Sequence, residues 1–366
     1  MIITLEKKEF SEAVAQVARF AERKSATLPV LSGIVILAGD AGIKLRATNL
    51  ETGIDIQVPG TITDPGVVVV PALVLKEITS SLSGTGTLTL EYAGDTVVIS
   101  SLSGRSTLKT LPYEDFPTLP LPEAPKAKFS LKNTEIQELI GSVMGCASTS
   151  IVRPELASIF IAAEGGTIKA VATDSFRLAE KKLSVSGKLP PFTILIPAKN
   201  AADIIQTLPN EEITLSLDDH QCVFMWSKGM LTTRLVTNSY PDYTQIIPKT
   251  FSAEATVLRK DLESTLRRVA VFSDTFQKIR IGFHGKEKSL VLTARNTDIG
   301  ESNEHITAAL TGEEIELSFN HRYLSAPLPL ITSDSVTVSA SGLGRATVIR
   351  GTGDTSFLYL VMPMNQ

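Results

Sequence analysis

A threefold internal repeat limits the folds open to this chain more than any other feature of its sequence. Three landmarks recur in the same order: a strand running into an amphipathic helix, a strand ending at a polar turn, and a strand leading into a second helix. A nearly constant period across three collinear landmarks indicates tandem copies of one structural unit. The matched positions are Leu5, Leu131 and Leu258, spaced by 126 and 127; Asn49, Asp174 and Asn296, spaced by 125 and 122; and Pro71, Pro197 and Asn320, spaced by 126 and 123.

Each copy shows the pattern of an α+β unit with two helices packed on antiparallel sheet. The first helix of each copy has one apolar stripe at helical spacing, and alternating strands joined by Gly and Asp turns lie between the helices. Pro-rich linkers place the three modules at 1–120, 128–248 and 253–366. Pro327 and Pro329 fall where the second helix of the last module is expected, which predicts a short or broken helix.

The composition is that of a globular protein, with 43% hydrophobic and 20% charged residues and a net charge of −4. Cys146 and Cys222 lie far apart, which argues against a disulfide framework. The longest apolar stretch, residues 67–75, is too short to span a bilayer and contains a proline. These features predict a soluble cytoplasmic protein without a membrane partner.

A search for catalytic chemistry finds no recognisable centre. The four histidines lie outside metal-binding motifs, and the sequence has neither a phosphate-binding P-loop nor a nucleophile elbow. Asp174 near Arg177 is the pair of polar residues most suggestive of a catalytic site. The favoured interpretation is that Asp174 only caps its own turn. The sequence therefore predicts a binding protein with no catalytic, cofactor or metal residues, and leaves an active site built from distant residues as an alternative.

Five segments together resemble one known family. They are TLPVLSGIVI at 27–36, LKTLPYEDFP at 108–117, VATDSFRLA at 171–179, SYPDYTQIIPK at 239–249 and YLVMPM at 359–364. In combination they resemble the bacterial replicative sliding clamp, the β subunit of DNA polymerase III. The resemblance implies a DNA-clamp fold and a head-to-tail homodimer whose six modules form a ring around duplex DNA.

The resemblance also implies a non-catalytic role. Such a ring is a processivity factor, which holds DNA without regard to sequence and tethers the polymerase III alpha subunit, the clamp loader, other polymerases and repair proteins. These partners bind through short linear peptides in a cleft between the second and third modules. The matching positions are Leu156, Thr173, Ser175, Phe176, Arg177, Leu178, Pro241, Ile246, Leu360, Met362, Pro363 and Met364.

Other family positions match only in part. The resemblance implies DNA contacts at Arg23, Lys24 and Lys199, whereas Leu73 and Glu155 replace expected contact residues. Ser175, Phe176 and Gln245 depart from the family's usual pocket rim. These departures leave open a clamp paralogue with a remodelled pocket, such as a spare or resistance copy.

The resemblance further implies a dimer contact between edge strands of the first and third modules, at about 103–110 and 271–276. Apolar residues in these segments are expected to touch, and basic residues of one copy to face acidic residues of the other. The implied interface residues are Arg105, Leu108, Val271, Phe272, Asp298, Glu301 and Glu304, with Lys109 beside Arg105.

Overall fold

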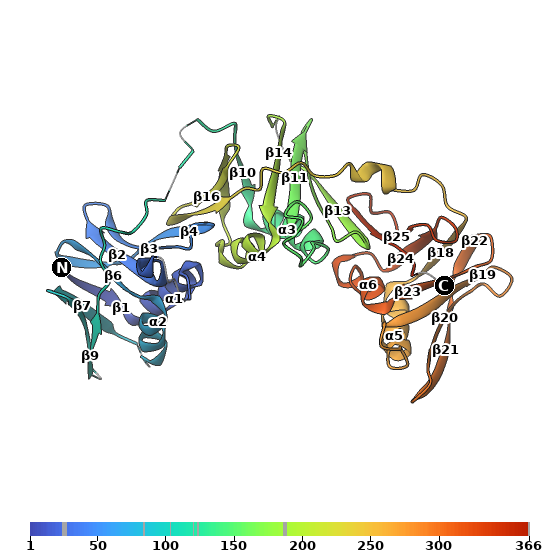
Figure 1. The fold of residues 1–366 in the computed structure, drawn as a ribbon, viewed down its shortest axis with the longest axis horizontal. Coiled ribbons are helices and arrows are strands. Elements are labelled where there is room, and N and C mark those ends of the chain that lie inside the picture. Colours follow the sequence, from blue (N-terminus) through green and yellow to red (C-terminus); the bar gives the residue numbers. More distant parts are fainter. Residues whose placement is uncertain are drawn as a thin grey trace. The chain divides into compact units, whose positions relative to one another are not determined.

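The computed structural model describes residues 1–23, 28–82, 85–102, 104–119, 121–122, 124–185 and 189–364 (Figure 1). A similar order of elements occurs three times along the chain, beginning with β1, β10 and β18, although the described residues of the second repeat include no counterpart of β5 and β22. The chain divides into two compact units, Met1–Thr134 with Lys199–Leu235, and Glu135–Ala198 with Val236–Gln366. This division cuts through the second repeat, so the module limits inferred from the sequence stay a prediction.

Unit 1 holds two antiparallel sheets. The first has the order β5-β1-β7-β8-β9, and the second has the order β10-β15-β16-β17-β4-β3-β2-β6. Helices α1 and α2 pack against each other and against β2, β3, β4 and β6. The bounds are β1 Ile2–Glu6, α1 Lys7–Val17, β2 Gly33–Gly39, β3 Gly42–Thr48, β4 Thr52–Val58, β5 Gly60–Asp64, β6 Gly66–Pro71, α2 Ala72–Ser81, β7 Thr87–Ala93, β8 Thr96–Ser101, β9 Gly104–Lys109, β10 Ala127–Lys132, α4 Ala198–Thr207, β15 Glu212–Leu217, β16 Gln221–Trp226 and β17 Gly229–Arg234, with 3₁₀ turns at Ala18–Phe20 and Pro29–Ser32.

Unit 2 also holds two antiparallel sheets, ordered β14-β11-β12-β13-β26-β25-β24-β18-β22 and β21-β20-β19-β23. Helix α5 packs on β20 and β21 and against α6. The bounds are α3 Asn133–Met144, β11 Ser158–Glu164, β12 Thr167–Thr173, β13 Arg177–Ser184, β14 Phe192–Pro197, η3 Tyr243–Ile246, β18 Ala253–Leu258, α5 Arg259–Ala270, β19 Lys278–His284, β20 Ser289–Asn296, β21 Gly300–Thr307, β22 Ala309–Gly312, β23 Ile315–Asn320, α6 His321–Ser325, η4 Leu328–Leu330, β24 Ser335–Ala340, β25 Thr347–Gly351 and β26 Phe357–Val361.

The predicted α+β class with antiparallel sheets is confirmed, and the apolar helix stripes are buried as expected. Phe10, Val14 and Val17 of α1 are buried, as are Leu262 and Leu266 of α5. Each helix therefore contributes one face to the core, as its spacing of apolar residues requires.

In the last repeat, the sequence correctly predicted a short second helix but misplaced one matched position at the start of the repeat. Helix α6 has five residues and is followed by the 3₁₀ turn η4, whereas α2 and α4 have ten residues each. The prediction of a short helix before Pro327 is therefore confirmed. The match of Leu258 to Leu5 and Leu131 is wrong by one position, because buried Val257 stands two residues before α5 while Leu258 is 54% exposed.

One long sheet in each unit joins strands from two successive repeats. In unit 1, β4 pairs with β17, and Thr52 lies opposite Thr233. In unit 2, β13 pairs with β26, and Arg177 lies opposite Val361. Continuous strand pairing thus connects the first repeat to the second and the second to the third.

Candidate functional site

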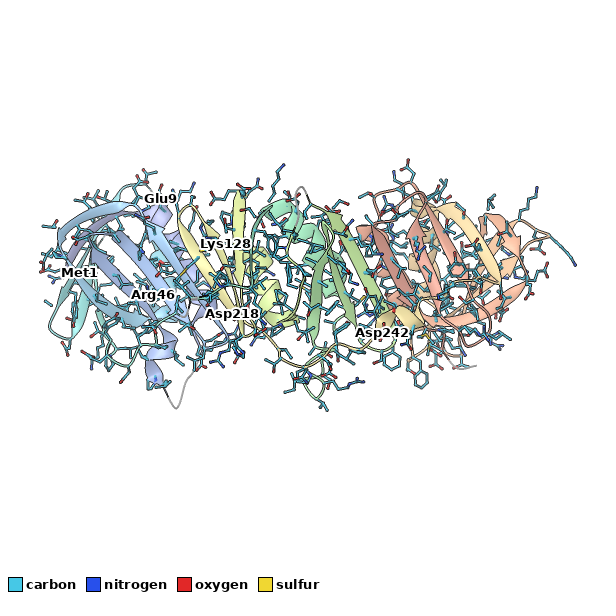
Figure 2. All side chains as sticks on the ribbon, turned by 90° about the horizontal axis from the view of Figure 1, so that it is seen from above. Met1, Glu9, Arg46, Lys128, Asp218 and Asp242 are labelled. Atoms are coloured by element: carbon cyan, nitrogen blue, oxygen red, sulfur yellow. The ribbon has the colours of Figure 1, made fainter. Side chains whose placement is uncertain are left out.

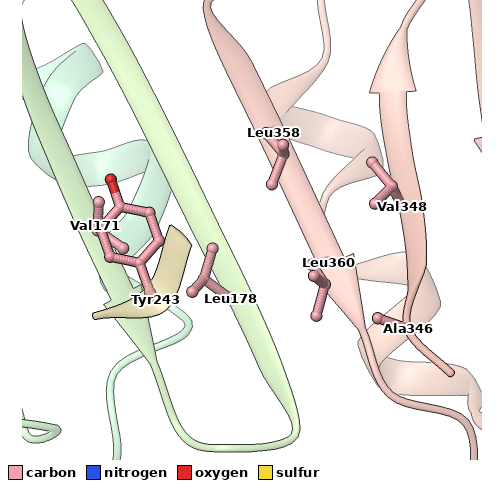
Figure 3. Packing of buried hydrophobic residues seen from close by; sticks show 7 residues of the cluster. All are labelled: Val171, Leu178, Tyr243, Ala346, Val348, Leu358 and Leu360. Atoms are coloured by element: carbon pink, nitrogen blue, oxygen red, sulfur yellow. The ribbon is translucent and has the colours of Figure 1, made fainter. Parts of the chain in front are cut away.

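The predicted peptide pocket surrounds the joint between β13 and β26 in unit 2. Leu178 and Leu360 are paired across the boundary between these two strands, and both are buried in one cluster with Tyr243 of the linker, which lies beside Leu178 (Figure 3). Val171, Ala346, Val348 and Leu358 complete the cluster. Leu156 and Thr173 are buried as well. Leu156, Thr173, Leu178 and Leu360 are therefore buried in this structure, so they can contribute only to the floor of the predicted pocket.

The turn before β13 displays one aromatic side chain at the rim. The Thr173 hydroxyl donates to the Arg177 carbonyl at 2.7 Å, and Asp174 Oδ1 accepts from the backbone N–H groups of Phe176 and Arg177, each at 3.0 Å. These bonds stabilise Ser175 at a φ of 79°, a left-handed conformation that costs energy for a residue with a Cβ. The fixed turn leaves Phe176 61% exposed.

Arg177 is held from both sides, so its position is set before any ligand binds. Its Nε donates to Asp174 Oδ2 at 3.0 Å, and its guanidinium lies 4.5 Å from the ring centre of Tyr323. Burial by itself would lower the pKa of Arg177, but the hydrogen bond to Asp174 and the neighbouring Tyr359 and Cys146 outweigh burial and raise it. Asp174 therefore both caps its turn and pairs with Arg177.

Polar groups beneath Arg177 tie it to the third repeat. The Tyr359 hydroxyl donates to the Tyr323 carbonyl at 2.8 Å, and burial raises the pKa of the nearby Cys146 thiol to about 12. The thiol is therefore protonated and unreactive at neutral pH. The sequence did not single out Tyr323, because it belongs to α6 and comes next to Arg177 only through the pairing of β13 with β26.

The linker forms the second wall of the pocket. Asp242, labelled in Figure 2, accepts hydrogen bonds from Thr244 and Gln245 and so caps η3. The Tyr243 hydroxyl donates to Glu180 Oε2 at 2.5 Å, which fastens η3 to β13. Pro241 is exposed and Ile246 is 50% exposed, so both predicted residues present apolar surface.

The chain end supplies the third wall. Strand β26 ends at Val361, and the backbone N–H of Met362 then donates to the Phe176 carbonyl at 2.8 Å. The N–H of Met364 donates to the Ser318 carbonyl at 2.7 Å, so the tail leaves the joint and reaches β23. Met362 is 36% exposed, while Pro363 and Met364 are half-buried. Phe176, Ile246 and Met362 thus form the accessible apolar part of the predicted pocket, whose flexible methionines suit varied partners.

In unit 1, the corresponding space beside the pairing of β4 with β17 is occupied by a side chain of the chain itself. Gly53 in β4 is equivalent to Leu178 in β13, because each is the second residue of its strand after the polar turn. A Cβ built on Gly53 would lie 2.4 Å from the side chain of Leu119. Leu119 of the first linker therefore occupies the equivalent space. Of the two joints within the chain, this physical difference favours only the second as a binding pocket.

The predicted DNA contacts lie on or beside helices of unit 1. Arg23 is exposed after the turn Ala18–Phe20, Lys199 is exposed in the first turn of α4, and Lys24 lies outside the described residues. Burial raises the pKa of Asp203, and the charges of Lys199 and Arg19 oppose that rise. Arg19, in the 3₁₀ turn after α1, donates to Gln206 of α4 at 3.0 Å, so Arg19 and Lys199 both lie near Asp203.

The predicted dimer contact needs correction. Residues 271–276 are not an edge strand: Val271 and Phe272 form a turn after α5, and the edge strand of that sheet is β21. Phe272 still lies beside Gly300, the first residue of β21, because a Cβ built there would come within 3.7 Å of its ring.

Some of the other predicted interface residues are exposed, whereas others are buried or already paired within the chain. Leu108 is buried in the core of its own sheet, and Glu304 already accepts from Arg268 at 2.8 Å. Glu304 is therefore already paired within the chain, and Leu108 could join a contact between copies only through its backbone. Arg105, Lys109, Asp298 and Glu301 are exposed.

Two strands at sheet edges, β9 and β21, are equivalent to strands that pair between successive repeats. The order of elements makes β9 equivalent to β17 and β26, and β21 equivalent to β4 and β13. The equivalents are paired within the chain, whereas β9 ends the five-stranded sheet of unit 1 and β21 ends the four-stranded sheet of unit 2. Unpaired edges of this kind expose backbone donors and acceptors that can pair with another strand.

Metal and membrane sites were also sought. Among the described residues, no three His, Cys, Asp or Glu side chains lie close enough together to hold a metal ion. Within the same ranges, every helix is too short or too polar to traverse a lipid bilayer.

Comparisons with known proteins cover nearly the whole chain. Three family models match in succession: the N-terminal, central and C-terminal domains of the DNA polymerase III beta subunit, at residues 1–120, 130–242 and 244–365. The beta sliding clamp of Synechococcus elongatus is 29% identical over 346 residues, covering 92% of both chains, and that of Vibrio cholerae is 25% identical and covers both fully. The DNA polymerase sliding clamp of Bacillus subtilis superimposes with a TM-score of 0.95 at 25% identity, covering 100% of this chain and 99% of that one.

Proposed function

The chain belongs to the DNA polymerase III beta subunit family, the beta sliding clamps, and we propose that two copies close head to tail into a ring around duplex DNA. The family is a non-catalytic processivity subunit, so the chain acts as a tether for a polymerase rather than as an enzyme. The observation that carries the ring is the pair of free edges β9 and β21, whose equivalents are joined within the chain.

The two internal joints support one register for the contact between copies. The last strands of the three repeats are aligned through their pairing with the strand before them. In that pairing Leu108 lies opposite Val97, Thr233 opposite Cys222 and Val361 opposite Thr347, so Leu108, Thr233 and Val361 are equivalent positions. Gly300 is equivalent to Thr52 and Arg177, since each begins its strand. The proposed contact therefore places Leu108 opposite Gly300 of the partner subunit. Burial of Leu108, like that of Thr233 and Val361, agrees with this position.

This register also arranges charge favourably. It places Thr107 opposite Glu301 of the partner subunit, with Arg105 and Lys109 on either side of Thr107 on the same face of the strand. Diagonal neighbours in an antiparallel pair are about 7–8 Å apart, within reach of long side chains. The acidic residue of one copy thus lies between two basic residues of the other.

An engineered disulfide tests this register. Ser106 lies opposite Ser302 of the partner subunit in the proposed contact, at the spacing of about 4.5–5.5 Å that suits a disulfide. A chain carrying Ser106→Cys and Ser302→Cys is therefore expected to form covalent dimers under mild oxidation, visible on a denaturing gel without reductant. The native Cys146 and Cys222 are buried and do not compete.

A chain carrying Thr107→Cys and Ser302→Cys is the matched control. A shift of one residue turns the two side chains to opposite faces of the sheet, so this pair should remain reduced. Equal cross-linking of the two variants, or none in the first, contradicts the proposed register.

We further propose that the pocket beside Arg177 binds short peptides of the polymerase III alpha subunit, the clamp loader and other polymerases and repair proteins. The exposed apolar side chains of Phe176, Ile246 and Met362 support this role, as does the preset guanidinium. Arg23, Lys24 and Lys199 are proposed to contact DNA phosphates without reading sequence. The proposed cellular location is the cytoplasm, where the DNA is.

A further inference from the structure

The carboxylate of Glu180 is buried on the face of β13 that carries the pocket floor. Glu180 is 6% exposed and lies two residues after Leu178, so both side chains point to the same face of the strand. Its Oε2 accepts from the Tyr243 hydroxyl at 2.5 Å, and Lys182 Nζ lies 2.9 Å from its Oε1. Burying a charge costs free energy unless such partners compensate for it. A carboxylate at this position therefore needs an explanation beyond core packing.

The tyrosine that bonds to Glu180 belongs to the turn that carries part of the pocket wall. Tyr243 is the buried residue of η3, and Ile246 at the other end of the same turn is 50% exposed at the wall. The Tyr243 ring also packs edge-on against Phe160, with 6.5 Å between the ring centres. Apolar ring contacts are weakly directional, whereas a hydrogen bond to a carboxylate fixes both distance and direction. Glu180 therefore determines where η3, and with it Ile246, lies against β13.

The first repeat has an acidic residue at the same position but uses it differently. Asp55 is the fourth residue of β4, as Glu180 is of β13, and it is also buried. Its carboxylate is paired at 2.5 Å with Arg46 of the neighbouring strand β3. The first linker contributes Leu119 beside Gly53, and a leucine side chain has no donor. The buried acid thus stabilises the sheet itself in the first repeat, and it bonds to the linker in the second, where the candidate pocket lies.

We propose that Glu180 is a positioning residue of the peptide pocket, which holds η3 against β13 so that the wall at Ile246 is preset for a partner peptide. The inference rests on the proposed function and deepens it, because Glu180 acts on the peptide only through Tyr243. A wall already fixed in its bound position spares the peptide the entropic cost of ordering it, which raises affinity. Arg177 is preset on the other side of the pocket by Asp174 in the same way.

Removing the hydrogen bond from either end is expected to weaken peptide binding. Tyr243→Phe deletes the donor, and Glu180→Leu deletes the acceptor with little change in volume. Each full-length variant should bind a labelled peptide of the Gln-Leu-Phe type about tenfold more weakly, because a hydrogen bond to a charged group is lost. Glu180→Gln keeps an acceptor oxygen for the Tyr243 hydroxyl and should retain most of the affinity. Fluorescence anisotropy measures all three.

The double variant separates positioning from a general effect on stability. Removing one partner of a buried hydrogen bond leaves the other unpaired, whereas replacing both by apolar groups is often nearly neutral for folding. The chain with Glu180→Leu and Tyr243→Phe should therefore melt close to the wild type and above either single variant. It should still bind the peptide as weakly as the single variants do. Affinity that recovers together with the melting temperature indicates a purely structural role and overturns the inference.

Lys182→Ala is the matched control. It removes the partner of Glu180 Oε1, which is half-exposed, and leaves the bond to Tyr243 in place, so the affinity should stay unchanged. A loss of affinity equal to that of Tyr243→Phe would assign the effect to charge and overturn the role of the tyrosine bond. Normal affinity in both Tyr243→Phe and Glu180→Leu overturns this inference alone. A wild-type chain that does not bind the peptide contradicts the proposed pocket itself, and the inference with it.

Discussion

Replacing Glu301 by arginine is expected to convert the dimer into monomers. In the proposed register Glu301 lies opposite Thr107 of the partner subunit and diagonal to Arg105 and Lys109, so the substitution gathers three positive charges at one edge. Juxtaposed like charges at an interface cost several kcal/mol, which raises the dimer dissociation constant about 100-fold or more. Sedimentation velocity over a dilution series measures this change directly.

A charge-swapped rescue is the control for this prediction. Adding Arg105→Glu and Lys109→Glu to the Glu301→Arg chain restores opposite charges across the contact and should restore the dimer. Arg295 lies opposite Glu301 in the pairing of β20 with β21 and is present in both variants. Recovery of the dimer therefore reports on the contact between copies. A Glu301→Arg chain that dimerises like the wild type, or a rescue that fails while the chain stays folded, contradicts the proposed charge arrangement.

Replacing Ile246 by glutamate is expected to abolish peptide binding while leaving the ring intact. Ile246 is half exposed at the pocket wall, so the carboxylate is solvated in the free protein and costs little stability. A bound peptide would bury that charge without a partner, and loss of an apolar contact at such a position weakens binding about 100-fold. Titration of a labelled peptide of the Gln-Leu-Phe type measures the affinity.

Thr250→Glu is the matched control for Ile246→Glu. It adds the same charge at an exposed position a few residues further along the linker and should leave the affinity unchanged. Tight binding by the Ile246→Glu chain would place the peptide elsewhere. A wild-type chain with no measurable affinity would favour the alternative of a paralogue with a remodelled pocket.

The sequence predicted the fold well wherever local pattern decides it. Helical spacing of apolar residues identified α1, α3 and α5, and Pro327 predicted the short α6. The one-position error at Leu258 arose because Val257 and Leu258 are both apolar, and only the structure shows which of them faces the core. Periodicity gives the type of an element more reliably than its register.

Sequence reasoning was weaker where strands from different repeats meet. Residues 271–276 combine valine, phenylalanine and threonine, a composition typical of strands, but Asp274 accepts from the N–H groups of Phe276 and Lys278 and forms a turn instead. The family resemblance located the edge strand β9 at about 103–110, whereas β21 could be identified as the second edge only once the pairing of β4 with β17 and of β13 with β26 was known.

The candidate pocket residues could be predicted only through family resemblance. Arg177 and the Met362–Met364 tail could be matched by motif, whereas Tyr323, which stacks on Arg177, lies on a different repeat with no motif around it. Leu178 and Leu360 are buried in one cluster with Tyr243, whose hydroxyl donates to Glu180. Such contacts follow from tertiary packing, which a single sequence does not encode in any local pattern.

Retention on circular DNA tests most directly whether the repeats close into a ring. The chain is loaded by its clamp loader onto a nicked circular plasmid, washed at high salt to remove electrostatic contacts, and separated from free protein by gel filtration. A closed ring is held topologically, so the chain should elute with the circle and leave once the plasmid is cut to a linear form. Equal retention on circular and linear DNA, or release from the circle by salt alone, would contradict the ring.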